Sequence, residues 1–180
     1  IPLRHGKILV GDACSALAAT NDGPFQLIIA DPPYFQVLDA GWDNQWHNEE
    51  DYLRWTDTWV DQCSSRLADD GLFYIFGQLG KREHIWLHVC SRLTRRLQFH
   101  DMIIWDRAVG YNERSDSFTP QYEMILVLRK SGGANPYFNK DAVRIPYDDA
   151  TIRAYLRDKR YNDQAARQQH LQAVKYATNI

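Results

Sequence analysis

The stretch Ile28–Tyr34 constrains this chain more than any other. An apolar run, Gln26–Ala30, stops at an acid, two prolines and a tyrosine. The run predicts a short buried strand. Because proline cannot donate a hydrogen bond to a sheet, that strand must end at Asp31. Asp31 is therefore expected at the carboxyl end of a strand, which is where open α/β sheets bind their ligands.

The rest of the chain alternates between strand and helix patterns. Strands are predicted at 7–10, 26–30, 72–76, 99–105 and 122–128, and helices at 14–19, 49–68, 81–97 and from 149 onward. Asn48 is the expected N-cap of the second helix. A strand–helix–strand opening makes the first two strands parallel and brings Asp12 and Asp31 into one crevice. The order predicts an α/β fold with a doubly wound, mostly parallel sheet.

Composition places the chain among globular proteins. Its 180 residues are 44% hydrophobic and 13% aromatic, enough for one domain with a core. No apolar run approaches the roughly 20 residues of a membrane span, and the start resembles no signal peptide. The start also lacks Met and is expected to be trimmed. The cysteines Cys14, Cys63 and Cys90 are odd in number and widely spaced, which indicates reduced thiols and a cytoplasmic protein.

Charge gives no global argument for nucleic-acid binding, since the formal net charge is −2. Any nucleic-acid binding must therefore use local basic patches. The sequence offers two such patches: Arg92, Arg95 and Arg96 in one, and Arg153, Arg157, Lys159 and Arg160 in the other.

The residues Asp31, Pro32, Pro33 and Tyr34 suit a flat ring that carries an amino group. An aromatic amine is a poor nucleophile because its lone pair is delocalised into the ring. A carboxylate that accepts one N–H and a carbonyl, that of Pro32, that accepts the other would free this lone pair, while Tyr34 stacks on the ring. Such a ring is inaccessible inside a duplex, so a nucleic-acid base would have to be flipped out.

Further candidates lie in the loops. Trp42 and Trp46 follow the proline turn, where aromatics either stack on a base or pack as a lid. Arg107, Arg114 and Phe118 lie in a polar loop, 106–120, that suits phosphate and base contacts or is simply solvated. His84 and His88 share a helix face, but no third ligand is evident and no metal site is expected.

In their order along the chain, these segments resemble the amino-group DNA methyltransferases. Asp31-Pro32-Pro33-Tyr34 is similar to their catalytic motif, and Gly11-Asp12, Trp42-Asp43, Leu72–Gly77, Ile103–Asp106 and Tyr122-Glu123 resemble flanking segments. The order resembles the subgroup in which the catalytic motif precedes the cofactor loop. Phe35 departs from the usual Asn, and Tyr122 from the usual His.

The resemblance implies a Rossmann-like fold, S-adenosylmethionine as cofactor and double-stranded DNA as partner. It implies that Asp12, Ala13 and Asp31 bind the cofactor, and that Trp42, Arg107, Arg114 and Phe118 bind the substrate. Asp12 is alternatively only a helix cap. A homodimer and a restriction endonuclease counterpart are further implied partners.

The Phe-x-Gly-x-Gly cofactor loop of this family does not occur in these residues. We therefore expect a fold that is incomplete at its C-terminal end, with residues 1–148 as a partial catalytic core. Residues 149–180 are expected to form a helical appendage that begins a target-recognition region. Asp141–Tyr147 resembles a segment of adenine-specific members, so adenine N6 is the expected target. Cytosine N4 is the alternative, and a non-catalytic nucleic-acid-binding remnant is an alternative of another class.

Overall fold

The chain forms two compact units. The computed structural model describes residues 2–3, 5–79, 84–110, 113, 115–158, 163–172 and 175–176. The first unit extends to Pro136 and the second spans Tyr137–Asn179. The second unit thus begins earlier than the 148/149 boundary that the sequence predicts. The reason is that β7 (Arg144–Ile145) pairs with β8 (Lys175–Tyr176), which ties the residues before 149 to the tail.

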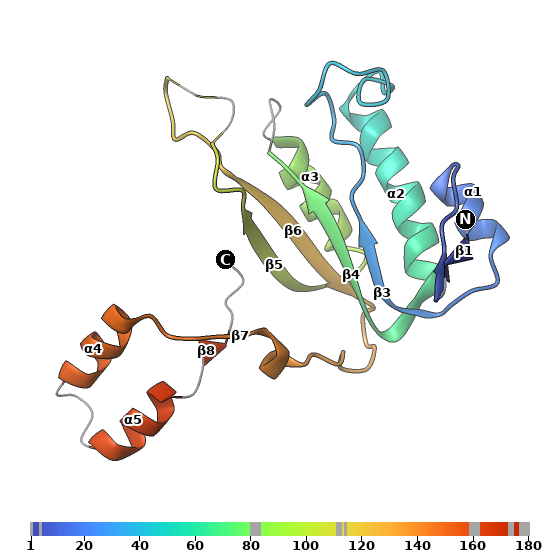
Figure 1. Ribbon diagram of the computed structural model, residues 1–180. Coiled ribbons are helices and arrows are strands. Elements are labelled where there is room, and N and C mark those ends of the chain that lie inside the picture. The colour runs from blue at the N-terminus through green and yellow to red at the C-terminus, as the bar shows by residue number, and fades with distance from the viewer. Residues whose placement is uncertain are drawn as a thin grey trace. The chain divides into compact units, whose positions relative to one another are not determined.

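A four-stranded sheet forms the centre of the first unit (Figure 1). Its strands are β3 (Phe25–Ala30), β4 (Leu67–Gly77), β6 (Tyr122–Arg129) and β5 (Gln98–Asp106), in that spatial order. β3 pairs parallel with β4, whereas β6 runs antiparallel to both β4 and β5. The predicted α/β class is confirmed, and three strands share one direction. The sheet is nevertheless mixed, because the chain returns after β5 and inserts β6 between β5 and β4.

The prediction of a sheet strand at 7–10 is wrong. β2 (Gly6–Lys7) ends at Lys7 and pairs antiparallel with β1 (Pro2–Leu3) in a separate two-stranded sheet. Residues 8–10 are exposed and lie outside any strand. Pairing between neighbouring segments closes only a very short loop, which costs less entropy than reaching β3 across the helix that follows. The parallel β-α-β opening therefore does not form.

Helices cover one face of the sheet. α2 (Glu49–Arg66) begins at the predicted N-cap Asn48, whose Oδ1 accepts a hydrogen bond from the Asp51 N–H at 2.9 Å. α1 (Ala13–Ala19) contacts α2, and α3 (His84–Leu93) lies beside it (Figure 1). The core includes apolar side chains from α2 and α3 and from alternate positions of β4 and β6. They are Trp59, Val60, Ile85, Trp86, Val89, Phe73, Ile75, Leu126 and Leu128.

The opposite face of the sheet carries exposed apolar side chains. Leu27 and Ile29 alternate along β3 with the core-packed Ile28, and they are 55% and 61% exposed. Trp105 on β5 is half exposed and packs its ring edge to face with Phe76 of β4. In the described sheet β3 is an edge strand, so both this edge and this face are open to further packing.

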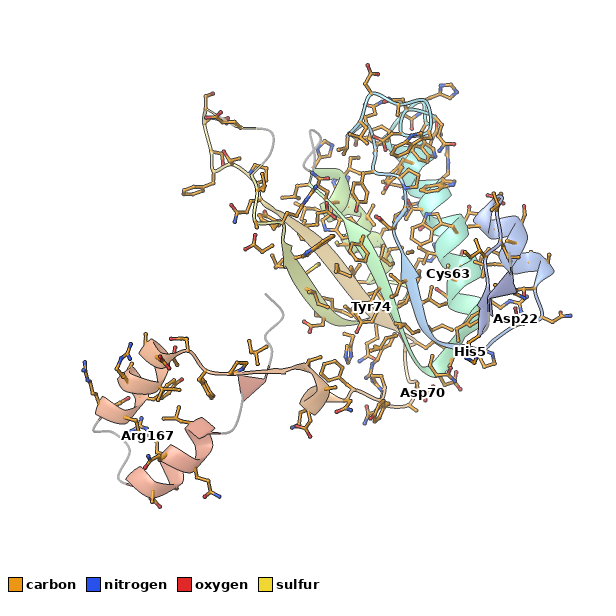
Figure 2. All side chains as sticks on the ribbon, viewed as in Figure 1. His5, Asp22, Cys63, Asp70, Tyr74 and Arg167 are labelled. Carbon is orange, nitrogen blue, oxygen red and sulfur yellow. The ribbon has the colours of Figure 1, made fainter. Side chains whose placement is uncertain are left out.

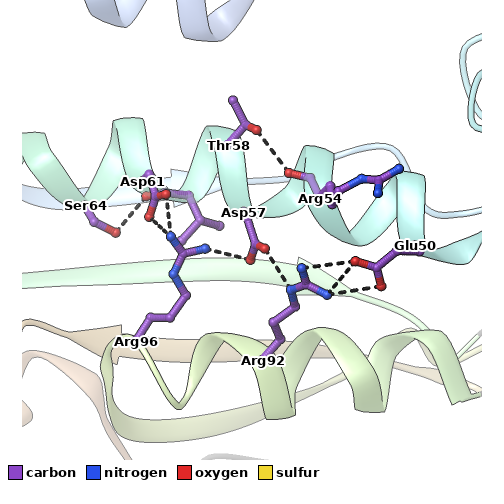
Figure 3. A network of polar contacts seen from close by, with 9 residues as sticks. Glu50, Arg54, Asp57, Thr58, Asp61, Ser64, Arg92 and Arg96 are labelled. Carbon is purple, nitrogen blue, oxygen red and sulfur yellow. Dashed lines mark hydrogen bonds and ion pairs between the residues drawn. The ribbon is translucent and has the colours of Figure 1, made fainter.

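Arg92 of α3 and Arg96, in the turn that follows α3, bind carboxylates of α2 (Figure 3). Arg92 Nε lies 2.7 Å from Asp57 Oδ2, and Arg96 Nη1 lies 2.7 Å from Asp57 Oδ1. Arg92 also pairs with Glu50, and Arg96 with Asp61. Two of the three arginines in the first predicted basic patch therefore join the two helices instead of forming an open cationic surface.

The second unit contains a 3-10 turn (Lys140–Val143) and the helices α4 (Asp149–Arg157) and α5 (Gln164–Gln172). Arg167 of α5 is buried, and its Nη1 donates to the Asp158 carbonyl at 2.6 Å (Figure 2). Its guanidinium also lies over the ring of Tyr155, 6.0 Å from the centroid. The tail that the sequence predicts as one helix thus forms two helices, and Arg167 links α5 to Asp158 at the end of α4. Lys159 and Arg160 of the second basic patch lie outside the described residues.

None of the helices in the described part of the chain is long and apolar enough to cross a lipid bilayer.

Gly77, at the end of β4, tests how the core is packed. A Cβ at this position would lie 2.1 Å from the ring of the buried Trp86. Gly77→Ala is therefore expected to lower the free energy of unfolding by about 1–3 kcal/mol, measured by urea denaturation. Gly41→Ala is the control, because a Cβ there meets no atom within 4 Å. Equal stability of the two variants would contradict this packing.

Candidate active site

Asp31 lies directly after β3. It is therefore at the end of the sheet where β4 and β5 also reach their carboxyl ends, which we call the carboxyl edge. Ala30, the last residue of β3, pairs with Ile75 of β4, and the two prolines then end the strand as predicted. The turn is anchored from α2, because the buried Tyr52 donates its hydroxyl hydrogen to the Pro33 carbonyl at 3.1 Å. Asp31 is exposed on a turn that proline and this bond hold rigid.

A chain of polar contacts runs from Asp31 across the sheet. The Tyr34 hydroxyl lies 2.9 Å from Asp31 Oδ1 and 3.5 Å from Glu123 Oε2. Arg107 Nη1 donates to Glu123 Oε1 at 2.8 Å. Glu123 is near the start of β6 and pairs with Trp105 of β5. Because β6 is reversed, its first residues lie at the same edge as the ends of the other three strands.

Tyr34 remains a hydrogen-bond donor over the ordinary pH range. Burial raises the pKa of its hydroxyl well above the usual value, and the hydrogen bond to Asp31 and the charge of Glu123 raise it further. A phenolate between two carboxylates would be strongly disfavoured. The hydroxyl therefore keeps its hydrogen, which it donates to Asp31, and Glu123 is the second carboxylate nearby.

These groups open onto a cavity of about 510 Å³. Its wall is largely apolar, with three carboxylates and one guanidinium among the lining side chains. This combination suits a planar ring with polar edges. The lining residues are Asp31, Pro32, Pro33, Tyr34, Val37, Leu38, Trp42, Asp43, Gln78, Trp105, Arg107 and Glu123.

Asp43 shapes the loop that follows the proline turn. Its side chain is 1% exposed, and Oδ2 accepts hydrogen bonds from the Val37 and Leu38 N–H groups at 2.7 and 2.6 Å. Its carbonyl accepts another from the Gln36 N–H at 3.2 Å. A buried carboxylate thus accepts the backbone hydrogen bonds that regular secondary structure would otherwise satisfy, and it fixes the shape of this loop beside the cavity.

The two tryptophans of this loop have different environments. Trp46 is buried and packs on Tyr52 and Trp55 of α2, with ring centroids 4.9 and 4.7 Å away. Trp42 is 54% exposed and lines the cavity. The packed-lid alternative therefore describes Trp46, whereas Trp42 lies at the cavity.

Asp12 and Ala13 lie apart from this cavity in the described residues. Asp12 is the N-cap of α1, and its Oδ1 accepts from the Ser15 N–H at 2.8 Å. Hydrogen bonds from Ser15 lower the pKa of this carboxyl. The predicted crevice shared by Asp12 and Asp31 relied on the strand at 7–10, which does not form, and the cavity that contains Asp31 is lined without Asp12.

The predicted substrate-binding loop is partly described. Arg107 lines the cavity and pairs with Glu123, and its N–H donates to the Gln121 carbonyl at 2.8 Å, which closes the base of the loop. Phe118 is 96% exposed. Arg114 lies outside the described residues.

The cysteines are free and protonated. Cys63 lies on α2 (Figure 2). Burial raises the pKa of Cys63 to about 11 and that of Cys90 to about 12, and it also raises the pKa of Cys14. A neutral thiol is a weak nucleophile.

The His84 Nε2 lies 2.7 Å from Glu49 Oε1, and no group of three metal-binding side chains occurs in the part of the chain that the structure describes.

Sequence reasoning gave no role to several residues that line the cavity. Glu123, Asp43 and Trp105 lie in segments of the resemblance that assign them no role, and Gln78 lies in no predicted strand or helix. The sequence signal that could have found three of them is their position at or next to the end of a strand, which holds for Gln78, Trp105 and Glu123. Only the pairing of the strands shows that they converge.

Comparison with known proteins identifies the family. The family model N6/N4 methyltransferase, described as DNA methylase, matches residues 25–175. The chain therefore belongs to this DNA methylase family.

Individual relatives agree with this assignment. The Type II methyltransferase M1.MboII of Moraxella bovis is 35% identical over 124 residues, which cover 68% of this chain and 45% of the relative. The DNA adenine methyltransferase YhdJ of Escherichia coli (strain K12) is 26% identical over 86% of this chain and 52% of the relative. The chain thus spans about half the length of these curated relatives.

A solved structure supports the fold. The PvuII DNA methyltransferase, described as cytosine-N4-specific, superposes with a TM-score of 0.55 at 16% identity. The match covers 73% of this chain and 50% of that chain.

The loop after the proline turn depends on Asp43. Asp43→Ala removes the acceptor of two backbone N–H groups, so we expect a loss of about 2 kcal/mol in the free energy of unfolding, measured by urea denaturation. Asp39→Ala is the matched control, because Asp39 is an exposed aspartate of the same loop and should change stability by less than about 0.5 kcal/mol. A loss of the same size in both variants would show that Asp43 does not organise the loop.

Proposed function

We propose that the protein transfers a methyl group from S-adenosylmethionine to the exocyclic amino group of a flipped base in double-stranded DNA, with adenine N6 as the target. The observation that carries this proposal is the placement of Asp31. In a member of a DNA methylase family, an exposed carboxylate on a rigid turn lines a cavity to which three aromatic side chains also contribute.

The role of each residue follows from the chemistry of an aromatic amine. Asp31 accepts a hydrogen bond from one amino hydrogen and the Pro32 carbonyl accepts the other, which frees the nitrogen lone pair for attack. Tyr34 stacks on the ring, and Trp42, which lines the cavity, adds an aromatic surface. Catalysis is then chiefly positioning and exclusion of water. No covalent enzyme intermediate is needed, which agrees with thiols that burial keeps protonated.

The cavity suits the proposed cofactor in its charge. S-adenosylmethionine supplies an electrophilic methyl group on a positively charged sulfur. Asp31, Asp43 and Glu123 line the cavity together with a single arginine, an acidic balance that suits a cation. Asp31, with Asp12 and Ala13, remains the proposed contact on this chain. A Phe-x-Gly-x-Gly loop elsewhere in the full-length protein, or on a partner chain, is proposed to bind the methionine part.

DNA contacts are proposed for Arg107, Arg114 and Phe118. Phe118 is almost fully exposed on its loop, as a side chain that meets a base requires. The second unit is proposed to begin a target-recognition region. A homodimer and a restriction endonuclease counterpart are proposed partners, the latter because a relative is a Type II methyltransferase.

Asp31→Ala tests the mechanism. In the protein expressed from its complete reading frame, this variant is expected to lose methyl transfer by at least about 10²–10³-fold, because it removes the acceptor aimed at the amino group. Asp31 is exposed, so thermal unfolding should stay unchanged. Asp39→Ala is the control and should keep full activity. Full activity of the Asp31 variant would rule out the proposed role.

The target base is identified from methylated DNA. DNA treated with the full-length protein and labelled cofactor is digested to nucleosides, and the modified nucleoside is identified by mass. N6-methyladenine is expected, because a relative that aligns over most of this chain is a DNA adenine methyltransferase. N4-methylcytosine would move the proposal to the other base. No modified nucleoside, together with no cofactor binding, would favour a nucleic-acid-binding remnant.

A further inference from the structure

The Tyr34 hydroxyl lies between two carboxylates. Its oxygen is 2.9 Å from Asp31 Oδ1 and 3.5 Å from Glu123 Oε2. A hydroxyl carries one hydrogen and so makes one strong donation at a time. At these distances the donation goes to Asp31, since 3.5 Å is long for an O–H···O bond. A small rotation of the Tyr34 side chain would transfer it to Glu123.

The bond to Asp31 opposes the proposed reaction. A carboxylate that already accepts a hydrogen bond from Tyr34 has part of its negative charge compensated, and one of its oxygens is occupied. Asp31 is then a weaker acceptor for an amino hydrogen. The state that binds a base best is therefore one in which the Tyr34 hydroxyl donates elsewhere.

Glu123 is built to receive that hydrogen. It is 9% exposed, so its position is set by the surrounding structure. Arg107 Nη1 holds Oε1 at 2.8 Å, and Oε2 is the oxygen nearest to Tyr34. The antiparallel pairing of Glu123 with Trp105 fixes its backbone at this edge of the sheet. Arg107 also balances the charge of Glu123 next to Asp31, which would otherwise repel it.

We propose that Glu123 is a positioning residue that accepts the Tyr34 hydroxyl hydrogen bond when a base enters, and so frees Asp31 to accept a hydrogen from the amino group. The proposal rests on the methyl-transfer function proposed above. Glu123 itself does not touch the reacting atoms. Its effect on the reaction is transmitted entirely through the Tyr34 hydroxyl.

The test compares Glu123→Gln in two backgrounds of the full-length protein, Tyr34 and Tyr34→Phe. In the Gln variant, Arg107 orients the amide oxygen toward itself, so an NH₂ group, which cannot accept, faces Tyr34. The hydroxyl then stays on Asp31. Single-turnover methyl transfer is expected to slow by about tenfold or more, with little change in the DNA concentration for half-maximal rate.

The Tyr34→Phe background is the decisive control. Without the hydroxyl, Glu123 has no hydrogen to accept, so Glu123→Gln should cause no further loss there. A merely structural role, such as holding Arg107 and its loop, would reduce the rate equally in both backgrounds. Equal losses, or no loss in the Tyr34 background, would overturn the proposal.

Two further arms complete the test. Glu123→Asp keeps the charge but withdraws the carboxylate by one methylene, and it should show the same dependence on Tyr34. It replaces Glu123→Gln if thermal unfolding shows that the Gln variant does not fold. A wild-type protein that methylates no DNA would overturn the proposed function and this inference together, whereas an active wild type with equal losses in both backgrounds overturns the inference alone.

Discussion

The reversed direction of β6 is the constraint on which the site depends. Because β6 runs antiparallel between β4 and β5, its first residues lie at the edge where the other three strands end. Glu123 therefore lies near Tyr34 of the turn after β3, and Arg107, just past the end of β5, donates a hydrogen bond to Glu123. In a uniformly parallel sheet the same glutamate would lie at the far end of its strand, and the cavity would lack one of its carboxylates.

Rigidity at this edge comes from buried polar groups on otherwise irregular backbone. Tyr52 anchors the proline turn from α2, and Asp43 binds the N–H groups of the loop that follows. Both residues are buried and therefore shielded from water. Shielding strengthens these hydrogen bonds and makes their loss costly. A site that works by orientation, as proposed here, needs such a support.

The same packing explains what the described unit leaves open. Its helices cover one face of the sheet, while Leu27 and Ile29 at the edge strand stay exposed on the other. The chain spans about half the length of its curated relatives. Under the proposed function, the described cavity around Asp31 holds the base that receives the methyl group. The cofactor then requires contacts from a further segment of the full-length protein.

The sequence by itself determined the elements whose cause is local. Proline ends β3 at Asp31, Asn48 caps α2, and the apolar periods place β5 and β6, because each signal depends only on neighbouring residues. The order of its segments also resembles the DNA methylase family, whose model matches residues 25–175. Only the tertiary structure decided which strands pair and in which direction, since hydrogen bonding between strands leaves no mark on the period of either. That is why the strand predicted at 7–10 does not join the sheet, and why Glu123, Asp43 and Trp105 line the cavity although the sequence assigns them no role there.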